Sequence, residues 1–252
     1  MPNHDSHAGH QMDNAATPHK TETAQAKLTL PQTIAPNQSV PLVIDVQGSN
    51  GKAIANFDTF QEQLMHLIVV SDDLQHFSHL HPEFKGNGRF EINADFPQPG
   101  NYNLFADYKP AGQKEQVSLL KATVPGKLST PFPTDLNRTK TFSDTKATLS
   151  LSNPTIKAGE EVTLQFNLQD AKTNQPLTNL QPYLGEKGHL VILRQSSPII
   201  QENYIHAHAL GKSRVGEVSF HTSFPQPGKY KLWGQFNRGG KIVTTDFWVE
   251  VK

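Results

Sequence analysis

The chain has 252 residues, 23 basic and 23 acidic side chains, and no cysteine. The balanced charge excludes the basic field that nucleic-acid binding requires, and no run approaches the roughly 18 apolar residues of a transmembrane helix. The lack of cysteine excludes disulfides, thiolate metal sites and a cysteine nucleophile, so histidine, methionine and carboxylate are the remaining metal ligands. The length favours two domains of ordinary size.

Residues 1–26 are polar and show no apolar period, which predicts a disordered tail. The tail is rich in histidine, and short His-rich tracts are typical of metal binding. The candidate tail ligands are His4, His7, His10 and Met12. An unstructured leader that holds no metal is the alternative interpretation.

From Lys27 onward, short alternating apolar and polar stretches are separated by Pro- and Gly-rich turns. This pattern contains no convincing helix and predicts an all-β fold of two tandem antiparallel immunoglobulin-like β-sandwiches. The predicted domains are residues 27–125 and 147–252, joined by a Pro-rich linker over residues 126–146. Such a linker favours two units that are not tightly fused.

The second unit repeats the first. Phe96-Pro-Gln-Pro-Gly returns as Phe224-Pro-Gln-Pro-Gly, and the strand that begins at Val40 has a counterpart that begins at Val162. A repeat of this length indicates duplication of a whole domain, because solenoid repeats are much shorter.

Each unit carries a strand that opens with histidine, followed by a strand that contains His-x-His. The candidate metal ligands are His66, His79 and His81 in the first unit and His189, His206 and His208 in the second. Side chains alternate between the two faces of a strand, so the two histidines of each His-x-His share a face.

The opening histidine joins that pair only if the turn between the strands has the right parity. A four-residue turn after Ser71 pairs Ser71 with His76 and therefore His66 with His81, whereas an odd turn sends His66 to the other face. Met65 is then expected to point away from His66. The same condition holds in the second unit, where the longer loop leaves the register open.

Three imidazoles converging from a rigid sheet suit Cu(II), Zn or Ni, with one coordination position open. The sequence therefore predicts one metal site on a hairpin in each domain. Because neutral imidazole is the ligating form, the metal affinity is expected to fall as the pH drops through roughly 6.5. Half-buried histidines with ordinary hydrogen bonds are the competing interpretation.

The residues also carry a family resemblance. His-Leu-Ile-Val-Val-Ser-Asp-Asp-Leu from His66, His-Leu-His-Pro from His79 and Phe-Pro-Gln-Pro-Gly-Asn-Tyr from Phe96 resemble exported bacterial proteins of the YtkA-like group. The second unit is similar in its Gly-His-Leu around His189 and its His-Ala-His from His206. These proteins are immunoglobulin-like sandwiches related in style to the CopC family of periplasmic copper binders.

The resemblance covers residues 27–252 and implies a periplasmic or secreted location and a role in copper or other heavy-metal handling, although no signal-peptide pattern is visible after Met1. We therefore expect an exported copper-binding protein that buffers the metal or delivers it to a copper-handling partner, with Cu(II) favoured and zinc as the alternative. No catalytic constellation is recognised, so no enzyme is predicted. Two alternatives remain: a metal-dependent enzyme with a histidine-only site, and an adhesion or assembly module with incidental histidines.

Overall fold

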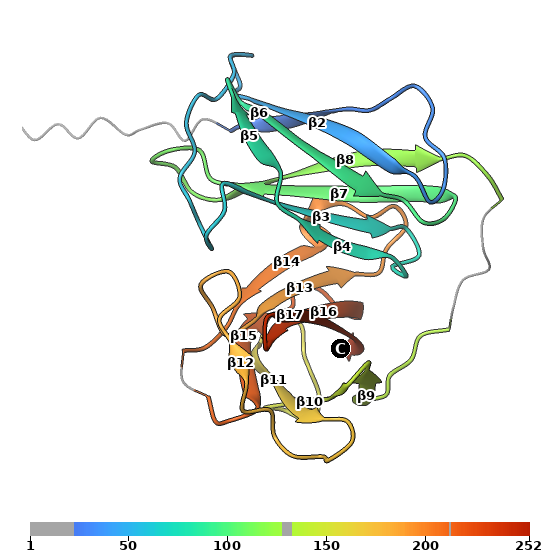
Figure 1. The fold of residues 1–252 in the computed structure, drawn as a ribbon, viewed down its shortest axis with the longest axis vertical. Coiled ribbons are helices and arrows are strands. Elements are labelled where there is room, and N and C mark those ends of the chain that lie inside the picture. The colour runs from blue at the N-terminus through green and yellow to red at the C-terminus, as the bar shows by residue number, and fades with distance from the viewer. Residues whose placement is uncertain (1–22, 128–132, 212) are drawn as a thin grey trace, which may run out of the picture.

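A computed structural model describes residues 23–127, 133–211 and 213–252. The described chain folds into two tandem antiparallel immunoglobulin-like β-sandwiches, stacked one on the other (Figure 1), which confirms the predicted fold class. It contains no helix with the length and apolarity that a membrane span needs. The predicted tail ligands His4, His7, His10 and Met12 lie outside the described residues.

The first sandwich consists of two four-stranded sheets. One has the order β1-β2-β6-β5, formed by β1 (Gln25–Thr29), β2 (Ser39–Gln47), β6 (Arg89–Asp95) and β5 (Glu83–Gly86). The other has the order β4-β3-β7-β8, formed by β4 (Phe77–Leu80), β3 (Met65–Ser71), β7 (Gly100–Tyr108) and β8 (Gln116–Val124). The alternation in β2 arises because Val40, Leu42 and Ile44 face the core between these sheets.

The second sandwich repeats this plan. One sheet has the order β15-β11-β10-β9, formed by β15 (Glu217–Ser223), β11 (Glu161–Asp170), β10 (Thr145–Leu151) and β9 (Thr139–Phe142). In the other, β16 (Gly228–Arg238) lies between β13 (His189–Arg194) and β17 (Lys241–Val251). The 3-10 turn η1 (Gln201–Asn203) and β14 (Tyr204–His208) follow β13, and the short β12 (Leu180–Gln181) pairs with the end of β16.

The predicted linker, residues 126–146, is too long. Strand β9 lies inside it, and β10 begins before it ends. Strand β9 pairs with one neighbour only, so half of its residues face solvent and give it the polar composition of a linker. Phe142 nevertheless packs against the core of the second sandwich, which makes the strand part of that domain.

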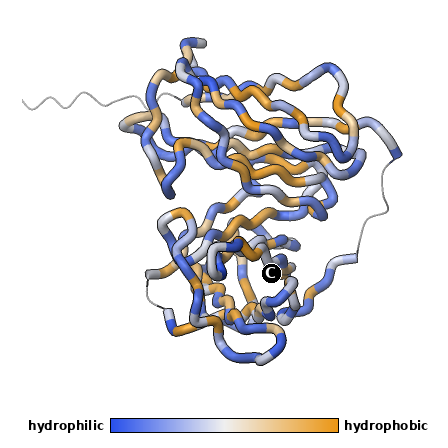
Figure 2. Tube along the Cα trace, in the orientation of Figure 1, coloured by the Kyte–Doolittle hydropathy of each residue, from blue (hydrophilic) through white to orange (hydrophobic). Residues whose placement is uncertain are grey.

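The two sandwiches share a third hydrophobic core, so the expectation of loosely joined units is wrong. Strand β3 directs Leu67 and Val69 into its own sandwich, while Ile68 and Val70 face the other domain. Both faces of β3 are therefore buried, which explains its unbroken apolar sequence. Strand β13 is buried in the same way, and Figure 2 shows apolar chain on both sides of the junction.

Contacts across this junction are reciprocal. Phe77 of β4 stacks on Trp233 of β16 with ring centroids 4.9 Å apart, and Tyr204 of β14 stacks on Phe105 of β7, also at 4.9 Å. In each sandwich, the second strand of the histidine hairpin therefore packs an aromatic side chain against a central strand of the other sandwich. This exchange of roles is the pattern of an isologous dimer interface, here within one duplicated chain.

Two lysines add hydrogen bonds to this junction. Lys231 of β16 is 3% exposed, and its Nζ donates to the carbonyl of Leu74 in the β3–β4 turn at 2.8 Å. It also pairs with Asp246 at 3.0 Å. From the other side, the Nζ of Lys121 donates to the carbonyl of Ile199 in the β13–β14 loop at 2.9 Å.

We expect Lys231→Met to lower the free energy of unfolding by about 2 kcal/mol, because the Leu74 carbonyl and Asp246 both lose a buried donor. Urea denaturation measures the effect. The control is Lys229→Met, which removes an exposed lysine two residues away and should change stability by less than about 0.5 kcal/mol. Equal effects of the two substitutions would contradict this role for Lys231.

Candidate metal centre

The histidines of both hairpins lie on the faces that the sandwiches turn toward each other. In the first unit, Ser71 N–H donates to the carbonyl of His76 and Leu67 pairs with Leu80, so the register predicted for His66 and His81 is confirmed. Met65 points into its own core, as expected. In the second unit the ladder pairs His189 with His208, so the even-loop condition holds there as well.

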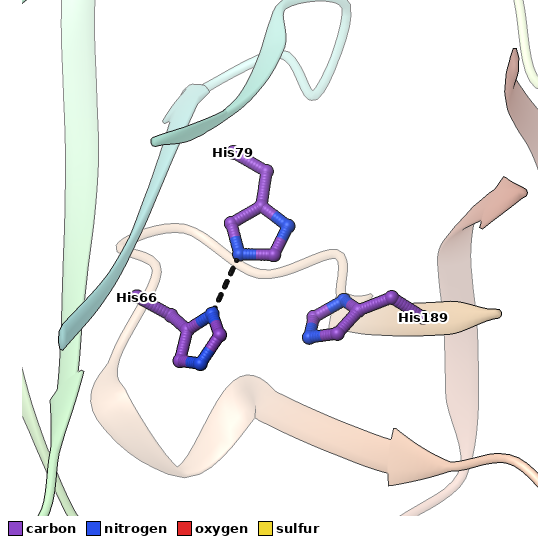
Figure 3. A group of neighbouring side chains, drawn as sticks. All are labelled: His66, His79 and His189. Atoms are coloured by element: carbon purple, nitrogen blue, oxygen red, sulfur yellow. Dashed lines mark hydrogen bonds between the residues drawn. The ribbon is translucent and has the colours of Figure 1, made fainter. Parts of the chain in front are cut away.

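The two predicted clusters join into one, because the faces that carry them pack together. His66, His79 and His189 offer ligand atoms that lie within 4.8 Å of one another, and their rings converge from β3, β4 and β13 (Figure 3). The ring of His206 lies beside that of His189 at a tilt of 47°, with centroids 4.3 Å apart. The candidate centre is therefore shared between the domains, which differs from the prediction of one site on each hairpin.

The rings of His66 and His79 each turn an unprotonated nitrogen toward the other. Nε2 of His66 lies 3.2 Å from the Phe60 carbonyl, and a carbonyl only accepts, so Nε2 carries the proton. Nδ1 of His79 donates in the same way to Oε1 of Gln235 at 2.7 Å. The inner nitrogens, His66 Nδ1 and His79 Nε2, are 3.0 Å apart. In the neutral rings no proton lies between them, and a cation would stabilise both.

His189 and His206 follow the same pattern. Nε2 of His189 donates to Oε1 of Gln61 at 3.0 Å, and Nδ1 of His206 donates to Oδ2 of Asp107 at 3.1 Å. The remaining nitrogens, His189 Nδ1 and His206 Nε2, are buried and have no hydrogen-bond partner. Buried polar atoms are rarely left unpaired, and an imidazole that ligates a metal characteristically donates its other N–H to an acceptor.

A tight turn, Phe60–Gln63, covers the centre. Its two middle residues are in the left-handed region, with φ of +46° at Gln61 and +64° at Glu62. For residues other than glycine this costs about 1 kcal/mol or more each, and such strain clusters at functional sites. The turn places the Gln61 amide between His189 and His208, whose Nδ1 accepts from Gln61 Nε2 at 2.9 Å.

The centre favours neutral imidazoles. Burial lowers the pKa of His66 to about 3, against the opposing effect of its hydrogen bond to Phe60. Burial also lowers the pKa of His79, His189 and His81, and nearby histidines reinforce this effect at His79 and His189. Proton competition at these rings therefore begins well below pH 6.5, so the expected loss of metal affinity moves to lower pH.

The remaining predicted ligands lie at the edge of the centre. His81 is half-buried, with its ring centroid 4.7 Å from that of His79, and its Nε2 is buried without a partner. His208 is exposed and stacks on His206 at 5.2 Å. Both lie outside the group whose ligand atoms are within 4.8 Å of one another.

Sequence reasoning missed the three acceptors Gln61, Asp107 and Gln235. Asp107 is the cross-strand neighbour of His66, and Gln235 is that of His189. To identify them, one must know how β7 pairs with β3 and how β16 pairs with β13, and no local sequence motif gives that register. The sequence did carry one signal for Asp107, which is a charged residue type in the otherwise uncharged sequence of β7.

Comparison with protein-family models finds one match, described as "Domain of unknown function (DUF8832)", over residues 20–125 and 140–252. The chain belongs to the DUF8832 family. The two matched segments correspond to the two sandwiches, as expected for a duplicated domain. No curated protein matches the chain.

Among solved structures, the chain is similar to Escherichia coli alpha-2-macroglobulin activated by porcine elastase, with 16% identity, a TM-score of 0.31, and coverage of 91% of this chain and 20% of that one. Invasin, a bacterial integrin-binding protein, gives 12% identity, a TM-score of 0.26 and coverage of 88% and 39%. A tetra-tandem repeat in the extending region of a large adhesion protein gives 12% identity and a TM-score of 0.31. That match covers 91% of this chain and 50% of the other. The chain spans less than two thirds of each structure.

We expect the metal-free protein to lose stability as the pH is lowered from about 6.5 toward 3. Unfolded His66 binds a proton near pH 6.5, whereas its pKa in the folded state is about 3. Between these values the unfolded state holds more protons, so acid favours unfolding by about 1.4 kcal/mol per pH unit for this ring.

Urea denaturation with a chelator present, repeated across this pH range, measures the slope. His66→Phe removes the titrating group. The slope of the free energy of unfolding against pH should then fall by about 1.4 kcal/mol per pH unit, the effect of one proton. An unchanged slope in that variant would contradict the assignment of this acid sensitivity to His66.

Proposed function

We propose that this protein binds one divalent transition-metal ion between its two sandwiches, with Cu(II) favoured and zinc as the alternative. It would act as an exported metal-binding protein that buffers copper or delivers it to a copper-handling partner. The observation that supports this most directly is the 3.0 Å approach of His66 Nδ1 to His79 Nε2. Two nitrogens bound to one ion at about 2.0–2.1 Å in tetrahedral geometry lie roughly 3.3 Å apart, close to that spacing.

Protonation is a poor substitute for a metal ion at this pair. One of the two rings would have to carry a positive charge to place a hydrogen between the nitrogens. Burial opposes that charge, since His66 is 0% exposed and its pKa is lowered to about 3. A metal ion accepts both lone pairs at once and leaves the outer N–H donors in place.

The chemistry of the donors supports a Cu(II)- or Zn(II)-type ion. The sequence has no cysteine, and Met65, the one methionine among the residues that the structure describes, faces away from the centre. Imidazole nitrogen suits copper(II) and zinc, and at a nitrogen site copper(II) binds more tightly than the other divalent first-row metals. The resemblance to exported copper-handling proteins agrees with this choice.

Burial favours holding the ion over catalysing a reaction with it. A catalytic metal keeps an open position for water or substrate. Here His66 is 0% and His189 1% exposed, and the Phe60–Gln63 turn covers the rings. A centre of this kind excludes substrates while it retains an ion.

The test is Cu(II) titration of the full chain in a background in which the candidate tail ligands and the fourth tail histidine are replaced by alanine, to remove binding by the tail. These are His4, His7, His10, Met12 and His19. We expect one tightly bound ion per chain. His79→Ala or His189→Ala, one substitution in each domain, should each weaken that binding by more than about 100-fold, because ligand loss exceeds the 10–100-fold effect of outer partners.

The matched control is His221→Ala in the same background. His221 is an exposed histidine paired with Glu161 at 3.4 Å, far from the centre in β15. It should leave the titration unchanged. Two ions per chain, each lost with the substitutions of one domain only, would instead support separate hairpin sites, and unchanged binding in all variants would refute the proposal.

A further inference from the structure

The two halves of the centre correspond residue by residue. Strand register pairs Ile68 with His79 and Val191 with His206, and in each case the apolar residue lies two positions after the opening histidine. His66 therefore corresponds to His189, and His79 corresponds to His206. Three of these four rings form the group with ligand atoms within 4.8 Å, and His206 is the one that this group omits.

The acceptors of the corresponding rings also correspond, with the domains exchanged. His79 of the first domain donates to Gln235 of the second at 2.7 Å, and His206 of the second donates to Asp107 of the first at 3.1 Å. Gln235 and Asp107 occupy equivalent positions, because each is the cross-strand partner of an opening histidine. Each domain therefore orients one histidine of the other.

His206 has the features of a metal-ligating histidine. Its side chain is 8% exposed, its Nδ1 is held by a carboxylate, and its Nε2 is buried without a partner. A proton on Nε2 would be a buried donor with no acceptor, which is unfavourable. His81 also has an unpartnered Nε2, but the structure gives it no buried carboxylate and it is only half-buried.

Asp107 places a buried carboxyl group beside the centre. It is 2% exposed, and its Oδ1 has no hydrogen-bond partner. The groups that accompany it are His206 at 3.1 Å and the Tyr204 hydroxyl at 3.4 Å. A buried carboxylate without a strong cation is costly, and a divalent ion bound to the adjacent imidazole offsets that cost.

We infer that His206 is the fourth ligand of a four-imidazole centre with two ligands from each domain, and that Asp107 is the positioning residue that aims it and lowers the charge around the ion. This inference rests on the proposed metal-binding function. His206 lies outside the 4.8 Å group, so binding as a fourth ligand requires its ring to move inward. Four protein nitrogens complete the coordination of a tetrahedral or tetragonal ion and leave no position for substrate.

The test uses the full chain in the tail-substituted background, loaded with one equivalent of Cu(II), with pulsed EPR to count bound imidazoles. The unsubstituted centre should show four imidazoles. His206→Ala should show three and bind at least about 10-fold more weakly. His81→Ala is the competitor, and it should leave the count at four.

Asp107 is tested with two substitutions of similar volume. Asp107→Asn retains an acceptor oxygen and removes the charge, so the count should stay at four while the affinity falls. Asp107→Leu removes both, so the count should fall to three with a 10–100-fold loss of affinity. A purely structural role for Asp107 would lower the melting temperature in both variants and leave the imidazole count unchanged.

The outcomes separate this inference from the proposed function. If His79→Ala and His189→Ala abolish binding but His206→Ala changes neither count nor affinity, the fourth-ligand assignment is wrong and the metal centre stands. A loss of one imidazole on His81→Ala in place of His206→Ala also overturns the assignment. If no variant alters copper binding, the proposed function itself fails.

Discussion

The packing of sheet β4-β3-β7-β8 against the sheet that contains β13, β14 and β16 is the constraint on which the rest of the molecule depends. It buries the outer faces of β3 and β13 and forms a third core around Trp233, Phe105 and their neighbours. The polar side chains on those faces are buried together with their apolar neighbours. An unpaired buried polar group is costly, and two of the histidines find an acceptor across the junction, His79 at Gln235 and His206 at Asp107. The histidine centre lies where these faces meet.

Within the centre, hydrogen bonds fix the two nitrogens of each ring in different roles, one as a donor and one with a free lone pair. The outer nitrogens donate to a backbone carbonyl, two amides and a carboxylate. The inner nitrogens are left with lone pairs in a region where burial disfavours protons. The backbone strain at Gln61 and Glu62 belongs to the same arrangement, since that turn supplies two of the four acceptors. Preorganisation of this kind is what metal ligands require.

Much of this could be predicted from local pattern. Alternation and turn residues were sufficient for the two sandwiches and the duplication, and turn parity placed His66 beside His81. The union of the two clusters could not be predicted, because it depends on which outer faces meet. The unbroken apolar run of β3 was a signal that both faces are buried, but it does not name the partner. The predicted linker failed at β9 because an exposed edge strand and a linker share a composition.

The reciprocal hydrogen bonds have a consequence for how such a chain can change over generations. In an ordinary tandem repeat each copy is free to drift once its own fold is secure. Here Asp107 serves a histidine of the second copy and Gln235 serves one of the first, so the copies have become mutually dependent. Either half on its own would lack the acceptor that orients one of its histidines. The acceptors also differ in kind, a carboxylate on one side and an amide on the other, so the two copies are not interchangeable.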